Sequence, residues 1–190
     1  MPRVIIMAAW LWILVVVLAL VVLFVIRVFN SLIRLRNEVD NSLAQIDVQL
    51  KRRYDLIPNL VETVKGYAKH EKELLESVTK ARAAMMSAGS LAEKASASDQ
   101  LSKTLKTLFA VAENYPQLKA NQNFLQLQEE LTGTENKISY ARQHYNDMVM
   151  LFNNRIQMFP NNLIAGMLGF KRRELFKAPE GEKEPVKVKF

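Results

Sequence analysis

A histidine beside an acid, and two acids in a row, are the groupings in this sequence whose types and spacing could support catalysis. His70-Glu71 begins like the zinc-protease motif His-Glu-x-x-His, in which two histidines on one helix face bind the metal. Leu74 occupies the position of the second histidine, so that metal site cannot be completed. Glu129 and Glu130 diverge by about 100° around a helix, so they cannot point at a common substrate. We therefore predict no catalytic residue, no cofactor and no metal site.

The composition removes several other kinds of chemistry. The sequence contains no cysteine, which excludes disulfides, iron–sulfur ligation, cysteine-bound zinc and thiol catalysis. The net charge is +7, but the excess lies in residues 1–57 and 161–190, and the middle of the chain is close to neutral. Nucleic-acid surfaces concentrate basic residues and place aromatic residues among them. We therefore predict no nucleic-acid partner.

Residues 52–61 form the first candidate interaction site. Arg53, Asp55, Pro58 and Asn59 give this stretch an unusual density of polar and helix-breaking side chains. One interpretation is a structural corner, in which Asp55 caps a new helix and Pro58 is tolerated in its first turn. The other interpretation is a recognition corner for a partner.

A basic triplet, Lys171, Arg172 and Arg173, is the second candidate interaction site, and it directly follows the apolar segment 163–170. Apolar residues followed by cations suit a segment that dips into a lipid interface while its cations meet lipid phosphates. In the alternative interpretation, Phe170 and its apolar neighbours simply cover the open end of a helical bundle.

Residues 4–26 must form the element that attaches the chain to a membrane, because they are 23 consecutive apolar residues. At about 1.5 Å per helical residue the run is about 34 Å long, enough to cross a hydrocarbon core of about 30 Å. It is longer than the apolar part of a signal peptide, which has about 7–15 residues. We predict an uncleaved single-pass helix after a short tail of residues 1–3.

Positive charge sets the predicted orientation of this helix. Arg27, Arg34 and Arg36 follow the apolar run, whereas Arg3 is the only basic side chain before it. Basic residues favour the cytoplasmic side. We predict a bacterial inner-membrane protein with its N-terminus outside and its C-terminal domain in the cytoplasm.

The apolar pattern after the membrane run is helical throughout and predicts an all-α protein. A single N-terminal transmembrane helix should continue into an antiparallel helical bundle with long helices over residues 27–160. The expected helices cover about 27–54, 56–87, 99–114 and 121–159, with a break or a kink at Pro58. Residues 161–178 are expected to be a membrane-proximal segment and 179–190 a flexible tail. The clearest signal is a coiled-coil-like recurrence every seven residues, at Phe124, Leu131, Ile138, Tyr145, Phe152 and Phe159.

Several stretches resemble the LemA family, and together they cover most of the chain from about residue 45. They are Tyr54-Asp55-Leu56-Ile57-Pro58-Asn59-Leu60-Val61, Val64-Lys65-Gly66-Tyr67-Ala68-Lys69-His70-Glu71, Glu113-Asn114-Tyr115-Pro116, Thr134-Glu135-Asn136, Ala141-Arg142, Tyr145-Asn146, Phe159-Pro160 and Gly169-Phe170. The resemblance implies a membrane-attached antiparallel helical bundle without an established enzymatic activity, and related magnetosome-membrane proteins imply a membrane-organising role. One departure is Phe152, where the resemblance leads us to expect the tyrosine of a second Tyr-Asn pair.

We predict a membrane-anchored, non-catalytic bundle that acts as a self-assembling scaffold or membrane-organising protein. Its expected partners are membrane lipids, further copies of itself and other membrane proteins. The alternative is an accessory subunit or adaptor of a membrane enzyme such as a protease, or an uncharacterised enzyme. The enzyme hypothesis requires the polar motif residues Arg53, Asp55, Asn59, Glu135 and Asn136 to converge in one concave pocket.

Overall fold

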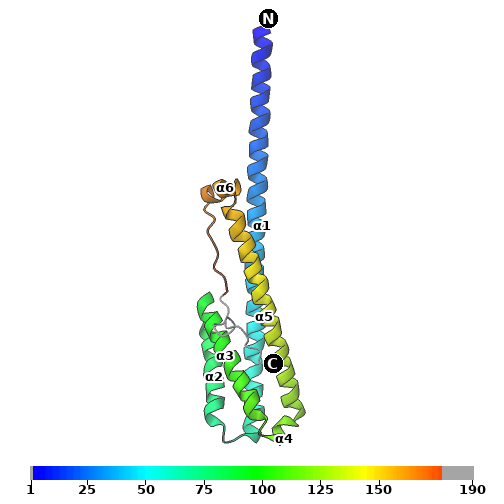
Figure 1. Cartoon of the computed structure of the whole chain (residues 1–190), viewed down its shortest axis with the longest axis vertical. Coiled ribbons are helices and arrows are strands. Elements are labelled where there is room, and N and C mark those ends of the chain that lie inside the picture. Colours follow the sequence, from blue (N-terminus) through cyan, green and yellow to red (C-terminus); the bar gives the residue numbers. More distant parts are fainter. Residues whose placement is uncertain (1, 177–190) are drawn as a thin grey trace, which may run out of the picture. The chain divides into compact units, whose positions relative to one another are not determined.

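The computed structural model describes residues 2–176 and the side chains of residues 10–176, and it is all-α, as predicted. No strand occurs in this described part. The 18-residue window that is apolar enough to cross a membrane lies near the N-terminus, and none of it is buried inside the protein. The tail predicted for residues 179–190 lies outside the described residues. The helices are α1 (Pro2–Tyr67), α2 (Lys72–Ser87), α3 (Leu91–Ala112), α4 (Pro116–Lys119), α5 (Gln122–Gln157) and α6 (Asn161–Met167) (Figure 1).

The chain divides into two compact units. Among the described residues, unit 1 comprises residues 2–41 and Asp147–Glu174, and unit 2 comprises Ser42–Asn146 with Leu175 and Phe176. Helices α1 and α5 each contribute residues to both units. The core of unit 2 brings together buried apolar side chains from α1 to α5, among them Ile57, Leu60, Val64, Leu75, Val78, Leu101, Leu105, Leu108, Leu118, Phe124 and Leu131.

Helix α1 continues through Pro58, so the predicted break between residues 54 and 56 is wrong. A proline inside a helix leaves the carbonyl of the residue four positions earlier without its donor. That carbonyl belongs to Tyr54, and it accepts a hydrogen bond of 2.9 Å from Nε of Arg82 in α2. A side chain 28 residues away therefore replaces the lost bond, which local sequence patterns cannot show.

The turn between α1 and α2 lies at residues 68–71, inside the helix expected over 56–87. The carboxylate of Glu71 accepts a hydrogen bond of 2.8 Å from the Tyr115 hydroxyl, which raises the pKa of Tyr115. The hydroxyl of Tyr67 accepts one of 2.9 Å from Asn121, whose side-chain oxygen also accepts from the backbone N–H of Phe124. The turn is thus tied to the segment before α5.

The two helices expected over 56–87 and 99–114 leave a loop between them. In the structure, these residues form a short link followed by the first turns of α3. Ser90 caps α3 and forms a capping box with Glu93, in which each side chain accepts from the other residue's backbone N–H. The Ser-x-x-Glu spacing was visible in the sequence. Small residues such as Ala95 and Ala97 are buried here, so this composition reflects close packing of helices.

Helix α5 is one helix of 36 residues and passes through Gly133 without a break. The heptad side chains from Phe124 to Phe152 are buried. Phe159 departs from the pattern, because α5 ends at Gln157 and the Phe159 side chain is 79% exposed. In unit 1, the ring of Phe170 meets the rings of Phe29 and Phe152 edge to face, with centroid distances of 6.4 and 6.3 Å.

Candidate functional site

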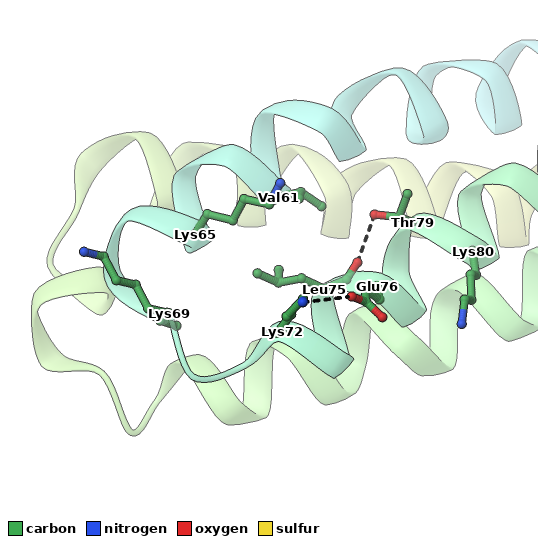
Figure 2. A pocket seen from close by; sticks show the side chains of 9 residues that line it. Val61, Lys65, Lys69, Lys72, Leu75, Glu76, Thr79 and Lys80 are labelled. Atoms are coloured by element: carbon green, nitrogen blue, oxygen red, sulfur yellow. Dashed lines mark hydrogen bonds and ion pairs between the residues drawn. The ribbon is translucent and has the colours of Figure 1, made fainter.

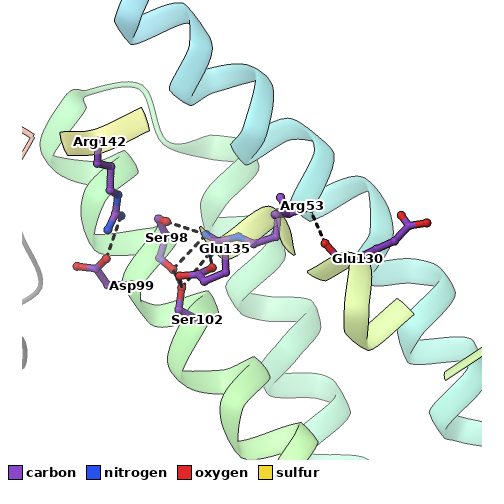
Figure 3. A network of polar contacts seen from close by, with 8 residues as sticks. Arg53, Ser98, Asp99, Ser102, Glu130, Glu135 and Arg142 are labelled. Carbon is purple, nitrogen blue, oxygen red and sulfur yellow. Dashed lines mark hydrogen bonds and ion pairs between the residues drawn. The ribbon is translucent and has the colours of Figure 1, made fainter. Parts of the chain in front are cut away.

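Arg53 lies at the centre of a polar network that joins α1, α3 and α5 in unit 2 (Figure 3). Its side chain is 0% exposed. Nη1 donates to the Ser102 hydroxyl at 2.8 Å and to the carboxylate of Glu135. Nη2 donates to the Ser98 hydroxyl at 2.7 Å and to the Ser98 carbonyl at 3.2 Å. The Ser102 hydroxyl donates to the second oxygen of Glu135 at 2.7 Å, so one carboxylate closes the network.

The electrostatics of this network are those of a structural ion pair. Burial lowers the pKa of Arg53, and the opposing charge and hydrogen bond of Glu135 counteract that effect. A guanidinium keeps its charge in proteins, so the buried Arg53 needs the carboxylate of Glu135, whose own side chain is 43% exposed. Ser102 both accepts from Arg53 and donates to Glu135, so its hydroxyl is engaged within the protein. The arrangement fixes the register of three helices through hydrogen bonds among its own side chains.

A second polar layer continues along α3 and α5. Arg142 donates to Asp99 at 2.9 Å, and both side chains are largely buried. The guanidinium of Arg142 also lies 4.6 Å from the centroid of the Phe176 ring. This stacking is favourable because the ring face is negative. Glu135 and Arg142 are seven residues apart, so the two layers occupy one face of α5.

Two asparagines of α5 hold the extended segment after α6 by its backbone. In unit 1, Asn153 donates to the Arg173 carbonyl and accepts from the Arg173 N–H, both at 2.9 Å. In unit 2, Asn146 donates to the Phe176 carbonyl at 3.0 Å and accepts from the Phe176 N–H at 2.8 Å. We call these pairs the asparagine clasp. The Tyr-Asn pairs matter through their asparagines, so Phe152 at the second pair leaves the clasp intact.

The other residues of the first candidate interaction site, Asp55, Pro58 and Asn59, do not converge on Arg53. Asp55 lies on the outer face of α1, where it pairs with Lys51 at 2.9 Å. It therefore does not cap a helix, because no helix begins there. Pro58 and Asn59 are exposed, and the Asn59 carbonyl accepts a hydrogen bond of 2.8 Å from the Thr63 hydroxyl. An interaction role for these three residues stays a prediction.

A lysine-rimmed cleft of about 390 Å³ lies between the end of α1 and α2 in unit 2 (Figure 2). Val61 and Leu75 contribute apolar surface, and Lys72 pairs with Glu76 at 4.0 Å. Lys65, Lys69 and Lys80 add positive charge around it. The cleft can attract an anion, but its lining contains no pairing of a nucleophile with a base.

The basic triplet lies in unit 1 beside a cleft of about 590 Å³. Arg173 pairs with Asp40 at 3.0 Å, whereas Lys171 and Arg172 are exposed and have no acidic partner in the described part of the chain. Arg36 also lines this cleft. Within residues 10–176, these three cations have no acidic partner and can meet an anion here.

The spacing of the asparagines is a sequence signal for the clasp that periodicity of apolar residues does not reveal. Asn146 and Asn153 are seven residues apart, which is about 10.5 Å along a helix. Arg173 and Phe176 are three residues apart, which is about 10 Å along an extended chain. Two asparagines one heptad apart on a helix can therefore each bind the backbone of one of two residues that lie three positions apart in an extended segment.

Fold and site together define an all-α bundle protein with a candidate membrane span, held by buried polar networks. Its residues 42–190 match the model of the LemA family, and the chain belongs to that family. It is 30% identical to the protein named LemA of Metamycoplasma hominis over 83% of this chain and 72% of that protein. It is 23% identical to the magnetosome protein MamQ 2 of Paramagnetospirillum magneticum, over 83% of this chain and 68% of that one. The magnetosome protein MamQ of Magnetospirillum gryphiswaldense is likewise 23% identical, over 81% of this chain and 66% of that one.

Proposed function

We propose that the protein is a non-catalytic, membrane-anchored scaffold that associates with itself or with other membrane proteins. The observation that carries this proposal is α1, which contains both the unburied apolar window and the buried face that packs into the bundle. One 66-residue helix thus combines anchor and scaffold without a linker. The magnetosome relatives, by their names, belong to an organelle, which agrees with a membrane-organising role.

The polar motif residues support a structural role. Arg53 is buried and pairs with the half-buried Glu135, while Asp55, Asn59 and Asn136 are exposed. The five side chains that an enzyme of this kind would need therefore do not share a pocket. The Arg53 network instead stabilises the arrangement of the helices that a scaffold must present.

Exposed apolar side chains on unit 2 support association with another protein. Val48 of α1 is exposed, as are Leu125 and Tyr140 of α5, and Tyr140 is 76% exposed. These residues are not needed to fill the core. Because aromatic residues are enriched at protein interfaces, Tyr140 is the position at which we expect a partner.

Cysteine crosslinking tests self-association directly, because the chain has no cysteine of its own. We expect the full chain carrying Tyr140→Cys to form a dimer with a short bis-maleimide in native membranes. The matched control is Gln100→Cys, an exposed position of α3, because Gln143 lies on the same face of α5 as Tyr140. Absence of a dimer at Tyr140, Leu125 and Val48, together with a monomer at every detergent-solubilised concentration, would overturn the proposal of self-association.

The proposed orientation places the N-terminus outside and the bundle in the cytoplasm of a bacterial inner membrane. It is supported by Arg27, Arg34 and Arg36, which all follow the apolar run. Ser96 is exposed on α3, so Ser96→Cys reports the side on which the bundle lies. A membrane-impermeant maleimide should label it only after the cells are lysed, and labelling in intact cells would reverse the orientation.

A further inference from the structure

We propose that unit 1 carries a docking surface for acidic phospholipids of the membrane that α1 crosses. The inference rests on the proposed membrane anchor and assigns a lipid partner to a surface outside the membrane-crossing helix. We call this the lipid-docking surface. It consists of the exposed apolar side chains Met158, Phe159, Leu163, Met167 and Leu168 and of the cations Lys171 and Arg172.

The depth of this surface follows from the ring contacts in unit 1. Phe170 meets Phe29 at 6.4 Å, and Phe29 lies three residues beyond Ile26, the last residue of the apolar run. Three residues of helix correspond to about 4.5 Å. The polar layer of a bilayer is about 5–7 Å thick on each side. Phe170 and the adjoining end of α6 therefore lie at the level of the lipid headgroups.

Helix α6 has one buried and one exposed apolar face. Ile164 and Ala165 are buried within unit 1. Leu163 and Met167 are four residues apart on the other face, and Met167 is 87% exposed. Phe159, just before the helix, is also exposed. Five large exposed apolar residues within eleven positions form a patch rather than scattered surface residues, and such patches mark sites of association.

The cleft beside the patch has the charge that an acidic phospholipid requires. Phe29 and Phe170 give its wall aromatic surface, and Arg36, Lys171 and Arg172 give it positive charge. None of the three cations has an acidic partner among residues 2–176. Arginine and lysine bind phosphate through charge-assisted hydrogen bonds. An apolar face at headgroup level, followed directly by the exposed cations Lys171 and Arg172, matches a segment that lies in the interface.

The asparagine clasp holds the cations in this position. Asn153 binds the backbone of Arg173, and the Arg173 side chain is occupied by Asp40. The two residues before it, Lys171 and Arg172, are thus attached to α5 by their neighbour while their own side chains remain free. Ordering them in advance reduces the entropy lost on binding lipid.

A fluorescent probe at Met167 tests the docking. The full chain with Met167→Cys is labelled with the environment-sensitive dye NBD and reconstituted in vesicles of phosphatidylcholine with or without phosphatidylglycerol. We expect blue-shifted emission and quenching by a headgroup-level spin-labelled lipid in the vesicles with phosphatidylglycerol. The shift should decrease in neutral vesicles and at high salt, because salt screens the cations.

The double variant Lys171→Ala/Arg172→Ala, combined with Met167→Cys, isolates the contribution of charge. Each cation near an acidic membrane contributes a factor of about five, so the ratio of docked to undocked probe should fall about 30-fold. The control is Lys103→Ala/Lys106→Ala, which removes the same charge from exposed positions of α3. It should leave the Met167 signal unchanged.

Flotation of the vesicles separates failure of the docking from failure of the anchor. Protein that floats with the vesicles while its Met167 probe stays water-exposed in every lipid overturns the docking and leaves the anchor standing. Protein that does not float overturns both. A blue shift that is equal in neutral lipid and in the double variant overturns selection of acidic lipids. A blue shift that persists without phospholipid and grows with protein concentration identifies a second copy of the chain as the occupant of the surface. That result overturns the proposal that the occupant is a lipid.

Discussion

The tripeptide Lys-Arg-Arg occurs once in each unit, at residues 51–53 in unit 2 and at 171–173 in unit 1. In unit 2 every member has an acidic partner, because Lys51 pairs with Asp55, Arg52 lies 3.9 Å from Glu130, and Arg53 binds Glu135. In unit 1 only the third member is paired, through the contact of Arg173 with Asp40, as far as the described residues extend. Identical sequence therefore builds a closed structural network in one place and an open cationic site in the other.

The difference comes from the chain around each tripeptide. Residues 51–53 lie in a helix, which places Asp55 one turn away and turns Arg53 toward α3 and α5. Residues 171–173 are extended and follow a short helix, so their side chains alternate in direction and meet fewer neighbours. A basic run becomes structural where acids are within reach, and it remains available for a ligand where they are not.

The same substitution in the two tripeptides gives the largest expected contrast. Arg53→Ala removes a large, fully buried side chain and its hydrogen bonds to Ser98, Ser102 and Glu135, so unfolding should become easier by about 2–5 kcal/mol. Arg172→Ala should leave the melting temperature of the full chain unchanged, because Arg172 is exposed and unpaired. Thermal and urea unfolding of the full chain in detergent, followed by circular dichroism, compares them. Equal melting temperatures for the two variants would mean that the Arg53 network is not structural.

Breaking the asparagine clasp should have the next largest effect. Asn153→Ala removes two hydrogen bonds to the backbone of Arg173, which should cost about 1–3 kcal/mol. Hydrogen exchange at residues 171–174 should accelerate, while Asn154→Ala, at an exposed neighbour, serves as the control. Unchanged exchange in Asn153→Ala would show that the triplet is held by other contacts.

Acid should weaken unit 2 through Glu93 to a smaller extent. Hydrogen bonds from the backbone N–H groups of Ser90 and Gly89 lower the pKa of Glu93 below its ordinary value of 4.5. A carboxylate whose pKa is lower in the folded state contributes stability above its ordinary pKa, and this contribution is lost as the pH falls through the lower folded value. Glu93→Gln should therefore show a flatter loss of stability below pH 4.5. Melting curves of both proteins across this range test the capping box.

Asp55→Ala should have the smallest effect. Asp55 pairs only with Lys51 in the described structure, and both side chains are more than half exposed. Exposed pairs contribute little because water and salt screen them. We expect a melting temperature close to that of the unchanged chain. A large decrease in the melting temperature would mean that Asp55 stabilises the protein through more than its exposed ion pair with Lys51.

Some properties follow from the sequence alone, because they depend on local periodicity. The apolar run after Arg3 and the heptads from Phe124 to Phe152 each require a helix, since no other arrangement places these residues on one continuous apolar surface. The all-α class and the family resemblance are therefore properties of the sequence pattern itself. The position of Phe152 in the apolar seam is also predictable, because its spacing continues the heptad.

Other properties were decided only by the tertiary structure, because the partner of a polar group can lie far away in sequence. Pro58 predicts a break by local rules, but Arg82 supplies the missing hydrogen bond from α2. Arg53 looks like a surface residue of a basic run until Ser98, Ser102 and Glu135 arrive from 45 to 82 positions away. The two Lys-Arg-Arg tripeptides are indistinguishable as sequence, and the acids that packing brings within reach distinguish them. Local pattern fixes which face of a helix is apolar, whereas only folding fixes which charges meet.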